Sequence, residues 1–272
     1  MSIITISRGS RSGGQALAEM VAEKLNYDCI SREILIEAAE EYGLDERTLI
    51  QFIDKPPKFW SRFNINRKMY LHLIKTTLLE HAQKGNLVYH GHSGQFLLKG
   101  IKSVLKIRLI ASMEYRIKLT MEKEKLNREA AIQYIQRVDD IRNRWAKFFY
   151  GVELTDPNLY DLIINIETMT LESACDIICG LTEKPEYQSN LYCLESIKDA
   201  TLAAKVEAAL FADARTKTLD INITSESGNV SLKGSIEVER VRQAVIEVVK
   251  SVEGVKSIND EMTIGKLTNI PT

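Results

Sequence analysis

The sequence predicts an α/β protein in which a parallel β-sheet flanked by helices is followed by a small α+β module of order αββαβ. The first part is predicted from short apolar or β-branched runs that alternate with segments of helical periodicity. Such alternation is typical of a parallel sheet covered by helices. These runs lie near residues 3–6, 28–30, 87–89, 104–110 and 160–165. The second part is predicted because a helix, two alternating strands, another helix and a last strand follow residue 193.

Length and composition are those of a globular protein with room for two domains. The chain has 272 residues, of which 44% are hydrophobic and 27% are charged. Lys and Arg number 36 against 37 Asp and Glu, so we expect no nucleic-acid partner. The sequence has no signal-peptide pattern and no apolar run long enough for a membrane span. We therefore expect a cytoplasmic protein without a transmembrane segment.

The four cysteines, Cys29, Cys175, Cys179 and Cys193, fit reduced and mostly buried thiols. Cys175 and Cys179 are four residues apart on a predicted helix and could hold a metal ion. Asp176 is the only adjacent candidate ligand, so the pattern favours a role in the core. We expect no metal site in the chain.

A strand, a glycine-rich turn and a helix follow one another from residue 3 onward. Such a turn directs backbone N–H groups and a helix N-terminus at one point, which suits a phosphate. Compared with the pattern G-x-x-x-x-G-K-[ST], the turn has Gly9 and Gly14, followed by Gln15 in place of Lys and Ala16 in place of Ser or Thr. From the loop alone, the alternative interpretation is a glycine-rich strand-to-helix turn that binds no ligand.

Four further segments bear on a binding site. Residues 31–39 and 44–53 are predicted helices, and aromatic and basic residues between 59 and 68 suit either a base clamp or a packed helical corner. A predicted helix over 69–84 leads through a short strand into a second glycine-containing turn over 90–94. The two histidines of that turn alternate along the chain, which argues against a metal pair.

Basic residues gather on a predicted helical stretch over 116–147, which Ser112 precedes as the N-cap of its first helix. Solvated ion pairs explain most of these charges. Arg137 and Arg144 lie two helical turns apart on one face, with Arg142 and Asp139 between them. Several guanidinium groups on one face suit a bridging phosphate.

Residues 1–182 resemble the cytidylate kinase-like family, a branch of the P-loop nucleoside monophosphate kinases. The resemblance rests on residues 4–8, 12–14, 31–35, 111–116, 139–142, 150–151 and 160–165. It implies a nucleotide-binding core, a helical region for the monophosphate near 31–80 and an arginine-bearing lid near 113–145. It also implies ATP and Mg²⁺ as cofactors, and transfer of the γ-phosphoryl group of ATP to CMP or dCMP.

The resemblance also implies a set of site residues. Catalytic roles fall to Arg116, Arg137, Asp139 and Arg142, where the arginines neutralise phosphoryl charge and Asp139 orients an arginine or the acceptor. Cofactor binding falls to Arg8, Ser10, Arg11, Ser12, Gly13, Gly14 and Gln15, and substrate binding to Ser31, Arg32, Gly91 and His92. The family usually has Asp at Ser31, Arg at His92 and a basic residue at Gln15. Arg11 is a candidate substitute cation for the loop.

The C-terminal module, residues 193–266, resembles a BON domain, with Gly228, Gly234 and the 252–255 turn at the typical places. A linker over 183–192 precedes it and a tail over 267–272 follows. The resemblance implies a non-catalytic module that binds a protein or a phospholipid. Two hypotheses result. The first is a nucleoside monophosphate kinase regulated or localised by this module, and the second is a catalytically impaired nucleotide-binding protein that signals through it.

Overall fold

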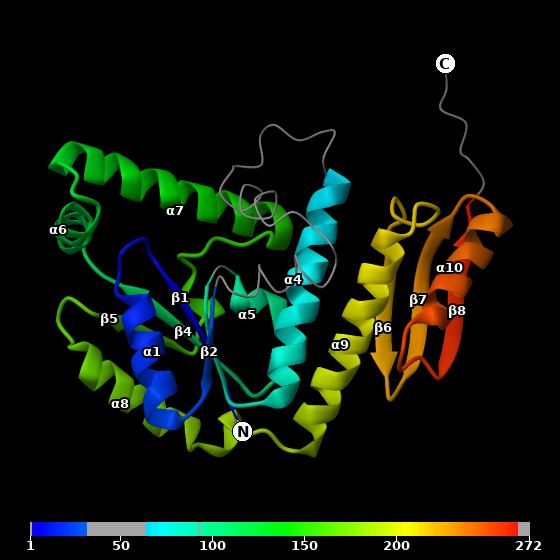
Figure 1. Ribbon diagram of the computed structural model, residues 1–272, viewed down its shortest axis with the longest axis horizontal. Helices are drawn as coiled ribbons and strands as arrows, with labels where there is room; N and C mark the ends of the chain where they lie inside the picture. The colour runs from blue at the N-terminus through cyan, green and yellow to red at the C-terminus, as the bar shows by residue number, and fades with distance from the viewer. Residues whose placement is uncertain (1, 32–63, 92, 266–272) are drawn as a thin grey trace. The chain divides into compact units, whose positions relative to one another are not determined.

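Figure 1 shows a computed structural model of the chain, which describes residues 2–31, 64–91 and 93–265. The chain forms two compact units. One comprises Met1–Phe59 and Lys84–Asn190, and the other comprises Trp60–Gln83 and Leu191–Thr272. The domain limits expected from the sequence, including the linker, stay a prediction.

The first unit is built on a five-stranded sheet in the order β2-β3-β1-β4-β5, and every neighbouring pair is parallel. The strands are β1 (Ile3–Arg8), β2 (Asp28–Ile30), β3 (Leu87–His90), β4 (Val104–Ile110) and β5 (Leu162–Asn165). The predicted parallel sheet is therefore confirmed. Because all five strands run the same way, the loops that follow β1 and β4 meet at one edge of the sheet.

Helices of the first unit are α1 (Gly14–Leu25), α5 (Gly94–Leu97), α6 (Met113–Glu124), α7 (Arg128–Tyr150) and α8 (Leu171–Thr182). Short 3-10 helices cover Pro157–Leu159 and Pro185–Tyr187. One face of the sheet is covered by α1 and α8, where Leu17, Val21 and Ile178 pack against Ile107 in a buried core. This packing fixes the start of α1 relative to the end of β1.

The predicted helical stretch over 116–147 is not continuous. Helix α6 ends at Glu124, Lys125 adopts φ 54°, and α7 begins at Arg128. A left-handed residue cannot continue an α-helix, and the Asn127 side chain accepts the free Ala130 N–H at the new start. The Ser112 cap of the first helix is confirmed, since its hydroxyl accepts the Tyr115 N–H at 3.2 Å.

The second unit contains α4 (Asn64–Lys84), α9 (Leu191–Ala212), β6 (Ile221–Glu226), β7 (Asn229–Ile236), α10 (Glu239–Ser251) and β8 (Ser257–Ile264). Strands β6 and β7 are antiparallel, and β7 and β8 are parallel. The predicted order αββαβ is confirmed for the C-terminal segment. Its core joins both helices to the sheet through Leu202, Val206, Val230, Leu232 and Val249.

Two boundaries of this module differ from the prediction. The helical spacing predicts a helix over 197–211, whereas α9 covers Leu191–Ala212 and begins six residues earlier. The sequence predicts a second helix over 238–252 capped by Gly254, whereas α10 ends at Ser251 with Val252 as its C-cap, and Gly254 lies in the turn beyond it with φ 97°. Helix periodicity identifies the buried stripe of a helix better than its solvent-exposed ends.

Helix α4 packs against α9 within the second unit through a charged cluster. Glu207 of α9 accepts from His72 at 2.6 Å and from Lys75 at 3.2 Å. The His72 ring also stacks on Phe211, with ring centroids 4.9 Å apart. Lys205 adds an ion pair to Glu80 at 2.6 Å. A helix within the sequence region that resembles the kinase family thus contacts the first helix of the C-terminal module.

Cysteine placement agrees with the prediction of mostly buried thiols. Cys175, Cys179 and Cys193 are buried, whereas Cys29 is exposed. The sulfurs of Cys175 and Cys179 lie 3.9 Å apart inside the core that α8 forms with the sheet. Over the described ranges, no three His, Cys, Asp or Glu side chains gather as metal ligands. Among those same ranges, no helix has both the length and the apolar character needed to cross a membrane.

Candidate functional site

The loop between β1 and α1 presents an open helix N-terminus. The Ser12 hydroxyl donates to the Gly9 carbonyl at 3.0 Å, and Gly13 takes φ 68° at the N-cap of α1. A Cβ at Gly14 would lie 2.5 Å from Cδ of Arg8, so the loop packs closely on that side chain. The first turn of α1 contains no acidic residue. The loop therefore offers backbone N–H groups and a positive helix end to an anion.

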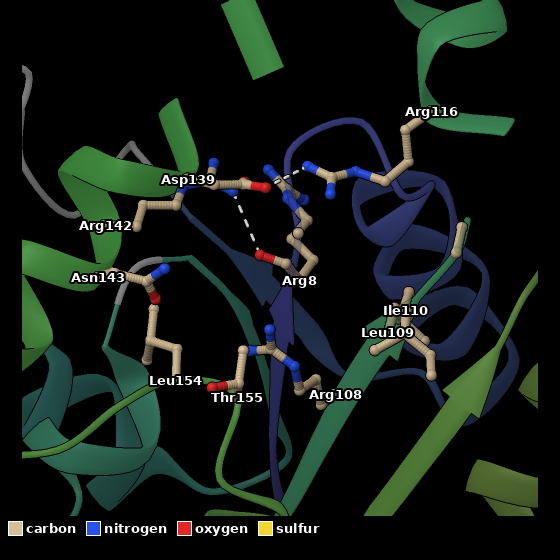
Figure 2. A pocket seen from close by; sticks show the side chains of 12 residues that line it. Arg8, Arg108, Leu109, Ile110, Arg116, Asp139, Arg142, Asn143, Leu154 and Thr155 are labelled. Carbon is tan, nitrogen blue, oxygen red and sulfur yellow. Dashed lines mark hydrogen bonds and ion pairs between the residues drawn. The ribbon is translucent and has the colours of Figure 1, made fainter. Parts of the chain in front are cut away.

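Arg116 of α6 and Asp139 of α7 hold the backbone of Ser10 at its carbonyl and at its N–H. Arg116 Nε donates to the Ser10 carbonyl at 2.7 Å, and Asp139 Oδ1 accepts the Ser10 N–H at 2.9 Å. Arg116 Nη2 also donates to Asp139 Oδ2 at 2.5 Å, as the dashed line in Figure 2 marks. Asp139 therefore orients Arg116 and fixes the loop at the same time.

Arg142 and Arg8 bring two further guanidinium groups to the loop. Arg142 Nη1 donates to the carbonyl of Arg8 at 3.2 Å, and Arg8 Nη1 lies 3.2 Å from Nδ1 of His90. Burial, followed by the nearby charges of Arg142 and Arg11, lowers the pKa of Arg8 to about 10. Burial also lowers the pKa of Arg142, although Asp139 acts in the opposite direction. Positive charge is thus crowded and desolvated here, which a bound anion would relieve.

These side chains surround a cavity of about 160 Å³. A cavity of about 150 Å³ is large enough for a benzene molecule, so this one can hold a group of phosphoryl size. Among the described residues that line it, four are arginines and one is a carboxylate. The lining comprises Arg8, Gly9, Arg108, Leu109, Ile110, Ala111, Arg116, Asp139, Arg142, Asn143, Leu154 and Thr155. Forked guanidinium donors around one cavity suit a phosphate.

Gln15, Arg11 and Arg137 are among the predicted site residues that do not line this cavity. Gln15 Nε2 donates to Glu19 on the exposed surface of α1 at 2.9 Å. Arg11, at φ 59°, directs its side chain to Glu124 and to the Tyr134 hydroxyl, so it does not serve as a cation in the cavity. Arg137 is exposed on α7. Helical phase explains the last difference, because residues 137 and 142 are five apart and face different directions.

The predicted substrate-binding residues lie at the ends of β2 and β3. Ser31 follows β2 and Gly91 follows β3, and neither lines the cavity. A Cβ at Gly91 would lie 2.6 Å from the hydroxyl of the buried Tyr89. Close packing against Tyr89 therefore explains why the second turn has glycine at this position. Arg32, His92, the predicted helices over 32–53 and the side chains between 59 and 68 lie outside the residues that the structure describes.

Arg108 and His90 contact or line the site although the sequence reasoning did not select them. Arg108 lies on β4, and its sequence signal was the alternation of Lys106 and Arg108 within an apolar strand. That alternation marks a polar strand face, but only the parallel pairing of β1 with β4 brings it toward Arg8. The sequence argued against a metal pair at His90 and His92, and the structure places the His90 ring against Arg8.

The parallel sheet, the glycine-rich loop after β1 and the arginine-bearing helices define a phosphate-loop α/β fold. Residues 3–168 match the cytidylate kinase-like family, and the chain belongs to that family. Residues 198–266 match the BON domain.

Relatives of known name agree with the family. The cytidylate kinase of Sulfolobus acidocaldarius is 26% identical over 189 residues, which cover 69% of this chain and 98% of that protein. The cytidylate kinase of Methanocaldococcus jannaschii is 27% identical over 179 residues, which cover 65% of this chain and 94% of that protein. A crystal structure of an uncharacterized protein from Eubacterium ventriosum shares the fold, with a TM-score of 0.54 and 19% identity. The match covers 67% of this chain and 98% of that chain.

Proposed function

We propose that this protein is a nucleoside monophosphate kinase that transfers the terminal phosphoryl group of ATP to CMP or dCMP. The observation that carries the proposal is the convergence of Arg116, Asp139 and Arg142 on the first glycine loop. Family membership supports the reaction class, and the names of the relatives support the acceptor.

In this proposal the loop binds the phosphates of ATP, and the arginines stabilise the charge of the transferring phosphoryl group. The N–H groups at the start of α1 would hold the phosphates of ATP, with Gly13 and Gly14 allowing their close approach. Arg116 and Arg142 would stabilise the charge that spreads over the oxygens of the transferring group. Asp139 holds Arg116 in place beforehand, so little reorganisation is needed during the reaction.

Mg²⁺ fits this site only as a partner of the nucleotide. Asp139 is the one carboxylate among the described residues around the cavity, and it already accepts from Ser10 and Arg116. The Ser12 hydroxyl donates to Gly9, and residue 16 is Ala. Mg²⁺ usually keeps several waters and binds through one or two carboxylates together with substrate phosphates. When bound, the ion would neutralise charge between the outer phosphates of ATP.

Arg8 compensates in this proposal for the missing loop lysine. Its side chain lines the cavity, whereas the side chain of Gln15 lies on the outer surface of α1 and Arg11 is engaged by Glu124. Arg8 also packs directly against the start of α1 at Gly14. A permanent charge at this position can stabilise the outer phosphates of a nucleotide.

The test is a coupled assay with ATP, Mg²⁺ and a panel of nucleoside monophosphates, together with calorimetric nucleotide binding. We expect turnover with CMP or dCMP that falls by a factor of about 100 or more in Arg142→Ala, the usual effect of removing a donor to transition-state charge. Arg144→Ala is the matched control on α7. Arg144 is exposed, pairs with Asp140 at 2.7 Å and does not line the cavity, so its loss should leave turnover nearly unchanged.

The same experiment separates the two hypotheses drawn from the sequence. Nucleotide binding without turnover for every acceptor would overturn the kinase proposal in favour of a nucleotide-binding regulatory protein. Failure to bind any nucleotide would overturn both.

A further inference from the structure

Arg108 is a half-buried guanidinium that the sheet itself directs into the cavity. It lies on β4 beside the last residues of β1, and the parallel register pairs it with Ser7. Figure 2 shows its side chain reaching the cavity from the strand side, near Thr155, while Arg142 and Asn143 reach it from α7. Arg108 therefore lies on a different wall of the cavity from the lid residues.

Tyr160 holds this guanidinium in place without neutralising it. Arg108 Nη1 donates to the Tyr160 hydroxyl at 3.0 Å, and its Cζ lies 5.3 Å from the centre of the Tyr160 ring. The tyrosine is fixed in turn, since its hydroxyl donates to the Leu154 carbonyl at 2.9 Å. A cation over an aromatic face is attracted to it, but its charge remains available to an anion.

Lys106, two residues earlier on the same strand, shows what a structural cation on this face looks like. Its ammonium pairs with Asp161 at 3.1 Å, and it does not line the cavity. Over the residues that the structure describes, no carboxylate lies within ion-pair distance of Arg108. The guanidinium of an arginine has five N–H donors, and Arg108 gives one of them to Tyr160. The other four are therefore not paired with a carboxylate of the described residues.

We propose that Arg108 is a phosphate-binding residue that contacts, from the sheet side, the phosphoryl group held opposite Arg142. The inference rests on the proposed function in taking nucleotide phosphate as the natural anion. The cavity has room for one phosphoryl group, and Arg8, Arg116 and Arg142 already surround it with positive charge. A fixed guanidinium on the remaining wall completes a cage of forked donors around that group.

The test compares Arg108→Met with the matched control Lys106→Met in the full-length protein. Pyrophosphate is the probe, and its affinity is measured by calorimetry at low ionic strength, well below the unfolding temperature. We expect Arg108→Met to bind pyrophosphate at least about tenfold more weakly, the usual effect of losing one charge-assisted hydrogen bond. Lys106→Met should stay within about twofold of the parent, because Lys106 does not line the cavity. Arg108→Lys keeps the charge without the fork and should fall between them.

Unchanged pyrophosphate affinity in Arg108→Met would overturn the inference, and so would a parent protein that does not bind pyrophosphate. A purely structural role would lower the unfolding temperature of Arg108→Met and leave the affinity of its folded form intact. If Arg108→Met does not fold, Arg108→Lys decides by its affinity alone.

Pyrophosphate binding needs no turnover, so this inference can fail separately from the proposed function. Lost binding in Arg108→Met together with no kinase activity in the parent would keep Arg108 as a phosphate ligand and reject the kinase. If the parent is an active kinase and Arg108→Met keeps both its pyrophosphate affinity and its KM for ATP, the kinase proposal stands and the role of Arg108 as a phosphate ligand is rejected.

Discussion

Replacing Arg8 with methionine should stabilise the protein while removing its affinity for phosphate. Arg8 is largely buried, and its near neighbours include the charges of Arg142 and Arg11. A cation whose folded pKa is lower than its unfolded pKa destabilises the fold at every pH below the folded value. The pKa of Arg8 is lowered to about 10, so the full penalty is present at pH 7 and is relieved only as the pH rises through about 10.

The size of this effect follows from the lowered pKa and from the contacts that the substitution removes. Each tenfold change in acidity is worth about 1.4 kcal/mol, so the charge of Arg8 destabilises the fold by about 3 kcal/mol. Loss of the contact with His90 costs about 1 kcal/mol. Methionine is unbranched and fills a similar space beside Gly14. The net gain is about 2 kcal/mol, which raises the unfolding temperature by about 4–8 °C for a chain of this size.

Thermal unfolding followed by circular dichroism at pH 7 and low ionic strength, with and without pyrophosphate, measures both effects. Arg8→Met should unfold at a higher temperature than the parent and lose the rise that pyrophosphate gives the parent. Arg144→Met, which removes an exposed ion pair, should shift the midpoint by no more than about 2 °C. If Arg8→Met unfolds at a lower temperature than the parent, the contacts of Arg8 outweigh its charge penalty and the reasoning is refuted.

Three further substitutions test other parts of the structure. Gly94→Ala should lower the free energy of unfolding in denaturant by about 1–3 kcal/mol, because the new Cβ would lie 2.3 Å from the buried ring of Tyr89. Gln15→Lys should change the calorimetric ATP affinity by less than about twofold, because the side chain at this position lies on the exposed surface of α1. Glu207→Gln should lower the unfolding temperature at pH 7. Burial raises the pKa of Glu207, but the hydrogen bonds and charges of His72 and Lys75 together outweigh burial, so the net pKa is lowered.

Each of these predictions has a clear contrary result. Unchanged stability in Gly94→Ala would mean that the second glycine turn shifts freely. A large gain in ATP affinity in Gln15→Lys would mean that residue 15 reaches the phosphates.

The effect of Glu207→Gln should depend on pH. A carboxylate with a lowered folded pKa stabilises the fold above its unfolded pKa, and this contribution is lost as the pH falls through the folded value. The difference between Glu207→Gln and the parent should therefore shrink below about pH 4, and a constant difference would exclude the charge as its cause.

Local patterns in the sequence determined the elements and their order. The β-branched run at 3–6, the glycine-rich turn and the helical spacing after it predicted β1, the loop and α1. Alternating strands separated by turn residues predicted the αββαβ module. These predictions succeeded because periodicity, glycine conformation and capping act over a few neighbouring residues. The resemblance to the cytidylate kinase-like family placed Arg116, Asp139 and Arg142 among the candidates.

Only the tertiary structure decided which of the candidates meet. Asp139 reaches the Ser10 N–H across 129 residues of sequence, and no local signal fixes such a distance. Arg137 is left exposed by the phase of α7, which depends on the break at residues 125–127. Arg108 joins the cavity because β4 pairs with β1 in parallel. Burial, helix phase and strand register arise when distant segments pack, so the chemistry of each arginine was set by its neighbours in space rather than in sequence.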